Sequence, residues 1–217
     1  MGTDNGALPN RPAVPDPYYR SLVWLDVRLG VLFAVGVPLV LLVWSVARRQ
    51  PALIRLMGLY WKVSSLLLIA LLLLVDQRPS GYPLLVLAPL LILVSLWFWV
   101  DLNEELADMP PWRPLPLTVR IWRWSLSGLA LFSAGLAITA LPCMAVRPGL
   151  GVCQAWLEAP RGLNNAVDKV FDFVFGADWN PGVAAFLGYL ALVAYGVGLL
   201  QWLLVRLPRQ GRVAGEF

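Results

Sequence analysis

The sequence contains no histidine among its 217 residues. This absence excludes histidine-ligated haem, histidine-based zinc or di-iron sites, and catalysis by serine–histidine or cysteine–histidine pairs. A glycine-rich phosphate loop of the Walker or dinucleotide type is also missing, and so is a CxxC motif. We therefore predict no catalytic residues, no bound metal and no cofactor, and we leave contacts with pigment or lipid open.

Charged residues are scarce as well. They make up 14% of the chain, whereas globular proteins carry about 25%. Hydrophobic residues make up 59%, and the mean hydropathy is +0.69. A soluble domain of this length could not bury so much apolar surface, so we predict an all-α integral membrane bundle that contacts membrane lipids. The net charge is +4, but the basic residues are scattered in ones and twos, which favours anchoring at membrane surfaces over nucleic-acid binding.

The apolar runs predict about five membrane-spanning helices within a domain over residues 18–206. A span needs about 20 mostly apolar residues to cross a hydrocarbon core of about 30 Å. The predicted spans cover residues 29–47, 56–75, 84–100, 120–141 and 183–205. Pro38 and Pro89 lie inside the first and third spans, where they predict kinks.

Three segments lie outside these spans. Residues 1–17 hold four prolines and predict a disordered tail, and residues 207–217 form a basic tail. Residues 142–182 form a long extramembrane loop. Within it, five apolar residues recur at helical spacing and predict a short amphipathic helix on the membrane surface. They are Val167, Val170, Phe171, Val174 and Phe175, opposite Asp168, Lys169 and Asp172.

The orientation follows from the basic residues. Five spans place the two termini on opposite sides of the membrane, and the side of the C-terminus carries ten Lys and Arg residues against seven on the other side. The positive-inside rule therefore predicts a cytoplasmic C-terminus. The N-terminus and the long loop then lie in the lumen or periplasm.

The two cysteines, Cys143 and Cys153, both lie in the long loop. Disulfides persist outside the cytoplasm, which favours a disulfide between them. Closing so short a loop stabilises a chain by roughly 2–3 kcal/mol on the chain-entropy model. Two unpaired thiols near the membrane surface are the alternative.

Four acids follow the third span: Asp101, Glu104, Glu105 and Asp108. If the helix continues past Val100, their spacing places them on one face. We favour a solvated face that pairs with arginines of the next helix, namely Arg113, Arg120 and Arg123. A docking face for a partner protein and a site for a hard cation are the two alternatives.

Lys62 lies well inside the second span, and an intramembrane charge is a candidate functional site. Its position towards the cytoplasmic end favours snorkelling to the headgroups or a structural ion pair. Small residues form stripes on the last two spans, which favour packing of these two helices against each other within the chain. Packing against a partner subunit is the alternative. The stripes are Ser127, Ala130, Ala134 and Ala137, and Ala184, Gly188, Ala191 and Gly198.

Four segments together resemble a family of uncharacterised integral membrane proteins from cyanobacteria. They read "SLVWLDVRLGVLFAVGVPLVLL", "WFWVDLNEEL", "CQAWLEAP" and "VRLPRQGR", and the resemblance covers roughly residues 20–212. It implies a thylakoid or plasma membrane and carries over no functional residues.

We therefore expect a non-enzymatic accessory, assembly or stabilising factor of a membrane-protein complex. The resemblance implies a cyanobacterial host and a photosynthetic complex. The alternatives are a small transporter or channel subunit that uses Lys62, and a divalent-ion-dependent membrane enzyme that uses the acidic residues after the third span.

Overall fold

A computed structural model describes residues 17–110, 112–145, 151–176 and 179–210. No β-strand occurs in these ranges. The elements are α1 (Pro17–Gly30), the π-helical turn η1 (Val31–Gly36), α2 (Val37–Ala47), α3 (Pro51–Val75), α4 (Gly81–Phe98), α5 (Val100–Asp108), α6 (Pro114–Ile138), the 3₁₀ turn η2 (Leu141–Met144), α7 (Gly151–Phe175), α8 (Pro181–Gln201), the π-helical turn η3 (Trp202–Arg206) and α9 (Leu207–Gln210).

Five helical stretches are long and apolar enough to cross a membrane. They are Pro17–Ala47, Pro51–Val75, Gly81–Phe98, Pro114–Ile138 and Pro181–Arg209. This confirms the predicted all-α membrane bundle. Proline begins α3, α6 and α8, where its missing N–H costs no helical hydrogen bond.

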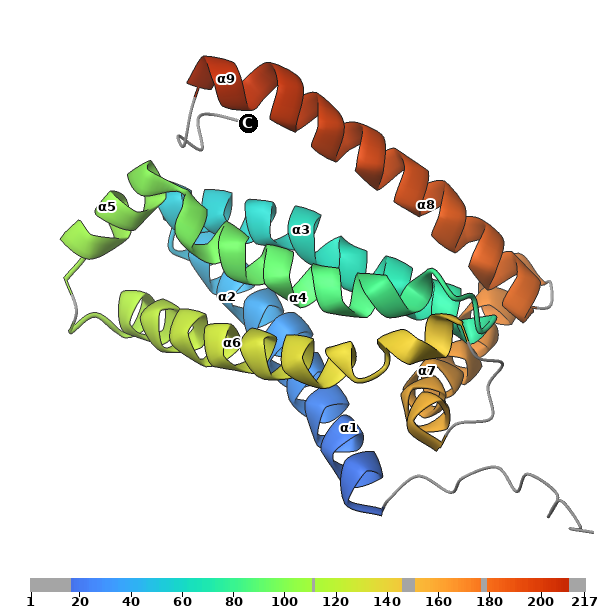
Figure 1. The fold of residues 1–217 in the computed structure, drawn as a ribbon. Coiled ribbons are helices and arrows are strands. Elements are labelled where there is room, and N and C mark those ends of the chain that lie inside the picture. Colours follow the sequence, from blue (N-terminus) through green and yellow to red (C-terminus); the bar gives the residue numbers. More distant parts are fainter. Residues whose placement is uncertain (1–16, 111, 146–150, 177–178, 211–217) are drawn as a thin grey trace, which may run out of the picture.

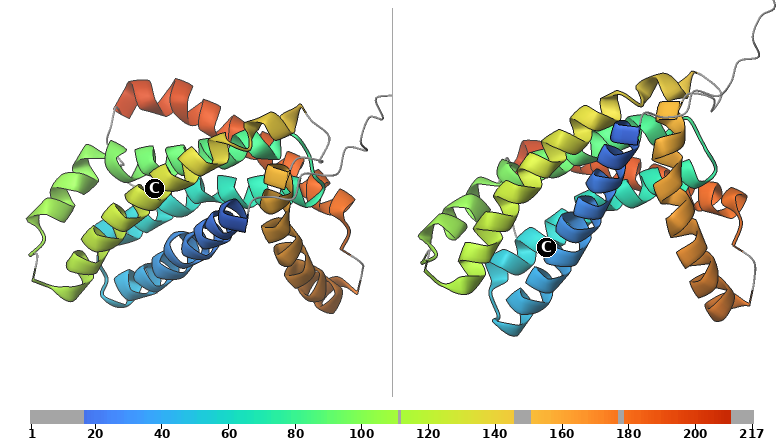
Figure 2. Two further views of the ribbon diagram at one scale, coloured as in Figure 1. Left: turned by 60° about the horizontal axis from the view of Figure 1, so that its bottom comes forward. Right: turned by 90° about the horizontal axis from the view of Figure 1, so that it is seen from below.

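The hairpin of α3 and α4 lies in the middle of the bundle (Figure 1). α8 packs on α3 from one side, whereas α6 packs on α4 and the first helix crosses over α3 and α6. Gly81 allows the tight hairpin, because a Cβ there would lie 2.7 Å from Leu74 Cγ. α7 contacts α1 and then points away from the bundle (Figure 2).

The helices extend beyond the apolar runs that predicted them. The first helix begins at Pro17 rather than residue 29, the second at Pro51 and the fourth at Pro114. Hydropathy marks the residues that meet hydrocarbon, whereas the helical hydrogen-bond ladder continues into the polar interface. The third span ends at Phe98, two residues before the prediction.

The loop predicted over 142–182 is mostly helical. α7 runs for 25 residues, with Pro160 inside it, in place of a short amphipathic segment. The last helix likewise continues through α9 to Gln210, so the predicted basic tail begins as a helix. Residues 1–16 and 211–217 of the predicted tails lie outside the described residues.

The first spanning helix is interrupted where Pro38 predicted a kink. Pro38 has no N–H to donate to the carbonyl of Ala34, and the N–H of Val37 bonds Leu32 instead of Phe33. Two side chains from other helices bond these carbonyls instead. Tyr60 Oη donates to Ala34 O at 2.6 Å, and Trp122 Nε1 donates to Phe33 O at 2.8 Å.

The rings of Tyr60 and Trp122 also pack edge to face, with centroids 5.1 Å apart. Both side chains are almost fully buried, at 1% and 2% exposure. The interruption of the first helix therefore fixes the positions of α3 and α6 around it.

Replacing Tyr60 by Phe should lower the free energy of unfolding by about 1–2 kcal/mol, because a buried carbonyl loses its donor. In a Pro38→Ala background an N–H is present at position 38, so the same change should cost about half as much or less. Thermal or denaturant unfolding of the purified protein measures both values. Tyr82→Phe is the matched control, because Tyr82 is buried and its hydroxyl has no hydrogen bond to a described residue. An equal cost in the two backgrounds would contradict the assignment.

Candidate functional site

The acidic segment is a separate helix, α5, and does not continue α4. Trp99 is extended, with φ −84° and ψ 110°, and Asn103 Nδ2 bonds the carbonyl of Trp97 at 3.0 Å. Leu102 and Leu106 are buried. Glu104 and Asp108 are exposed, whereas Asp101 and Glu105 are half-buried. The four acids therefore occupy two different environments.

Glu105 pairs with α3, and not with the arginines of α6 that the sequence favoured. Arg55 Nη2 lies 2.6 Å from Glu105 Oε1 and 2.9 Å from Oε2. Arg55 is 50 positions earlier in the chain, and α3 begins beside α5 because it runs antiparallel to α4. This ion pair ties the middle of α5 to α3.

The arginines of α6 bind the backbone near α5. Arg120 Nη2 donates to the carbonyls of Leu106, Ala107 and Met109 at 2.8, 3.1 and 3.3 Å. These carbonyls lie at the C-terminus of α5, where the helix offers them no internal donor. Arg113 is exposed. Arg120 therefore binds backbone carbonyl oxygens and not the carboxylates that the sequence predicted as its partners.

Arg123 is the buried cation of this region, at 5% exposure. Its Nη2 donates to Leu96 O and to Asn103 Oδ1, and its guanidinium lies 4.3 Å from the centre of the Trp97 ring. It therefore joins α4, α5 and α6. A buried charge is tolerated when hydrogen bonds and an aromatic face replace water.

Lys62 lies on the exposed wall of a groove between α3, α4 and the last helix. The groove has a volume of about 500 Å³. Apolar side chains such as Leu91, Leu199 and Trp202 form most of its lining, and Gly198 of α8 also lines it. Lys62 is therefore a charged residue at the edge of an open, apolar groove.

The two small-residue stripes do not pack against each other. α6 and α8 lie on opposite sides of the α3–α4 hairpin (Figure 1). Ala184 is buried, and a Cβ at Gly188 would lie 3.0 Å from Leu73 Cδ2, so this stripe fits against α3. Ala191 is half-buried, whereas Gly198 is exposed. The stripe of α6 is buried towards α4, where Trp97 Nε1 donates to Ser127 Oγ at 2.9 Å.

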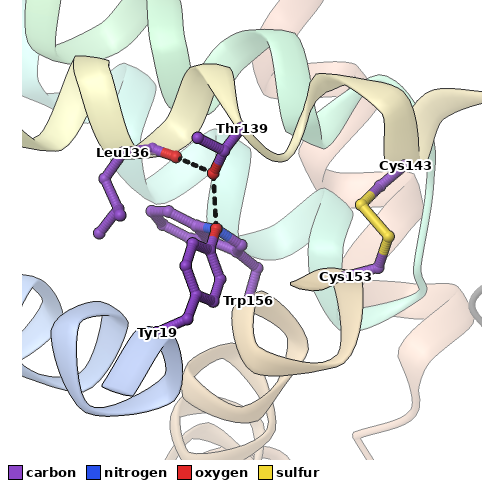
Figure 3. The surroundings of a disulfide bond; sticks show 6 residues. All are labelled: Tyr19, Leu136, Thr139, Cys143, Cys153 and Trp156. Atoms are coloured by element: carbon purple, nitrogen blue, oxygen red, sulfur yellow. Dashed lines mark hydrogen bonds between the residues drawn. A yellow bond between two sulfur atoms is a disulfide. The ribbon is translucent and has the colours of Figure 1, made fainter. Parts of the chain in front are cut away.

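The opposite end of the bundle holds the disulfide between Cys143 and Cys153, which the structure contains as predicted. Figure 3 shows Tyr19 next to Thr139 and Trp156 in the same region. Tyr19 Oη lies 2.7 Å from Thr139 Oγ1 and accepts a hydrogen bond from Trp156 Nε1 at 2.8 Å. Glu158 of α7 bonds Arg20 and Trp24 of α1. The disulfide and this network together fix α7 to α1 and α6.

Within the described residues, no group of three or more Cys, Asp or Glu side chains is placed to hold a metal ion. The family model described as "Protein of unknown function (DUF3177)" matches residues 20–215. The chain belongs to the DUF3177 family. No curated protein and no solved structure is similar to it.

Two polar residues inside the spans of this DUF3177 chain escaped the sequence reasoning. Arg123 was predicted to pair with the acids that follow the third span, and its burial was not foreseen. Asp26 lies before the predicted first span, which began at residue 29, but it is buried and accepts a hydrogen bond from Ser133. Pro114 was the available signal for Arg123, since proline favours the first position of a helix.

Arg120→Met should loosen α5 while leaving the core intact, because it removes three hydrogen bonds and keeps the apolar stem. We expect amide exchange in α5 to rise about tenfold, and exchange in α3 to stay unchanged. Hydrogen–deuterium exchange with mass spectrometry measures both. Arg113→Met is the control, because Arg113 is an exposed arginine near the start of the same helix. Unchanged exchange in α5 would show that Arg120 does not hold it.

Replacing both Cys143 and Cys153 by Ser should lower the free energy of unfolding by about 2–3 kcal/mol, because the unfolded chain loses a short covalent loop. Denaturant unfolding measures the difference. Reductant should destabilise the wild-type protein by a similar amount and leave the double variant unaffected. A double variant as stable as the wild type would contradict this role.

Proposed function

We propose that this chain is a non-enzymatic accessory, assembly or stabilising factor of a membrane-protein complex, and that α5 is its docking face. We expect a photosynthetic complex in a cyanobacterial thylakoid or plasma membrane. The C-terminus and α5 would face the cytoplasm, and the disulfide would face the lumen or periplasm. The observation that supports the proposal is that arginines from α3 and α6 fix α5 on one side and leave its other side exposed.

The inner side of α5 is bound at three points, by Arg55, Arg120 and Arg123. Its outer side presents Glu104 and Asp108, which are exposed. A surface helix that is fixed on one side keeps its outward carboxylates in a constant position, which lowers the entropy lost when a partner binds. Trp112, at 80% exposure, adds a large aromatic ring beside these acids, and such rings are enriched in interfaces.

The half of the bundle nearest α5 also has donors without acceptors. Four buried nitrogens have no hydrogen-bond partner among the described residues: Arg55 Nε, Trp61 Nε1, Trp99 Nε1 and Arg123 Nε. A buried donor without an acceptor costs about 1–3 kcal/mol. Because these nitrogens are buried inside the bundle, a partner on the outer face of α5 would not contact them. The docking proposal therefore rests on the exposed acids and on Trp112.

The test is crosslinking in native membranes followed by mass spectrometry, comparing the wild type with the double variant Glu104→Gln, Asp108→Asn. We expect crosslinks between α5 and a partner in the wild type, and at least a fivefold loss of co-purified partner in the double variant. The substitutions keep the size of both side chains and remove their charge, so the fold should be unchanged.

Asp172→Asn is the matched control, because Asp172 is an exposed acid on α7, outside α5. It should retain the partner. Equal recovery of partner with wild type and with the double variant would overturn α5 as the docking face. Purification of the wild type as a monomer without a partner would overturn the accessory function itself.

A further inference from the structure

The groove of about 500 Å³ lies between α3, α4 and the C-terminal half of the last helix. This volume falls within the range of about 300–1,000 Å³ that is usual for sites of small molecules. The lining is apolar, with Leu91, Val94 and Leu203 among its members. Among the described residues that line it, Lys62 is the one that carries a charge.

The groove is about as long as one leaflet of a membrane is thick. On the last helix its lining runs from Tyr195 to Leu207, which is about 18 Å of helix. A hydrocarbon core of about 30 Å gives each leaflet about 15 Å. Further towards its N-terminus, α8 closes on α3, because Gly188 lies so near Leu73 that a Cβ would come within 3.0 Å of its Cδ2.

This closure distinguishes between two kinds of occupant. A spanning helix of a partner is about 30 Å long and about 10 Å wide, and occupies more than ~2,000 Å³. The groove could take only one face of such a helix, and the contact between Gly188 and Leu73 closes the groove before the helix has crossed the membrane. An acyl chain of one leaflet matches both the length and the apolar lining.

The positive charge of Lys62 favours a lipid with a negatively charged head group. The Cα–Cβ bond of a helical residue tilts towards the N-terminus of its helix, which for Lys62 is the end of α3 at Pro51. That is also the end at which Phe98, Trp99 and Trp202 cluster, with ring centroids 5.2–5.9 Å apart. Tryptophan favours the depth of lipid head groups. The cation and the aromatic rings therefore lie towards the same membrane surface.

We propose that this groove binds one anionic lipid, with an acyl chain between α4 and α8 and its acidic head group directed towards Lys62. The proposal does not depend on the docking role of α5, since it rests on different residues. In this proposal Lys62 recognises the negative charge of the head group. The missing side chain at Gly198 leaves space for the acyl chain.

The two glycines of α8 near the groove provide a matched pair of variants. A Cβ at Gly196 or at Gly198 would meet nothing within 4 Å, so a side chain at either position starts without a clash. Only Gly198 lines the groove. Gly198→Leu should fill the site and reduce bound lipid at least tenfold, whereas Gly196→Leu should bind as the wild type does.

The measurement is native mass spectrometry of the full-length protein, purified in detergent and supplied with equal amounts of phosphatidylglycerol and phosphatidylcholine. We expect one retained phosphatidylglycerol per chain. Lys62→Gln should reduce the preference for phosphatidylglycerol about fivefold, the usual effect of one basic side chain at an anionic lipid surface. Lys169→Gln, which changes an exposed lysine on α7, should leave it unchanged.

Three results would overturn the proposal. One is equal lipid binding by the Gly198→Leu and Gly196→Leu variants. Another is bound lipid with no preference for the anionic head group, which would indicate ordinary annular lipid. The third is loss of a co-purifying protein or of a second copy of the chain from Gly198→Leu without loss of lipid, which would assign the groove to a protein.

Discussion

The interruption of the first spanning helix leaves the carbonyls of Phe33 and Ala34 without their helical donors, and Tyr60 and Trp122 replace those donors. Within a bilayer no water is available for this purpose, so the bonds must come from other helices. The requirement fixes α3 and α6 against the first helix at one depth. The rest of the bundle depends on this arrangement, because α4 packs between α3 and α6 and α8 packs on the outer side of α3.

The two ends of the bundle are held by different interactions. At one end a disulfide and the hydrogen bonds of Tyr19 and Glu158 join α7 to α1 and α6. At the other end arginines join α5 to α3 and α6, and several buried donors there have no acceptor among the described residues. The second end combines exposed acids with an apolar groove, which is why both proposals concern it.

The end of the groove has an identifiable structural cause. α8 lies close to α3 where Gly188 meets Leu73, and the small residues of the stripe at Ala184 and Gly188 allow this approach. The groove lining on α8 begins further along the helix, at Tyr195 and Gly198. The close contact of the two helices therefore separates the groove from the end of the bundle that carries the disulfide.

Composition and hydropathy along the chain were sufficient to predict the membrane class, the five spans and the pairing of the two cysteines, because each depends on residues close together in sequence. They also placed Lys62 inside a span. They did not predict that Glu105 pairs with Arg55, that Arg120 binds carbonyls, or that Tyr60 and Trp122 bond the interrupted helix. Those partners lie up to 89 positions apart. Only the packing of antiparallel helices brings them together, since local periodicity specifies which face of a helix is apolar and not which neighbour it meets.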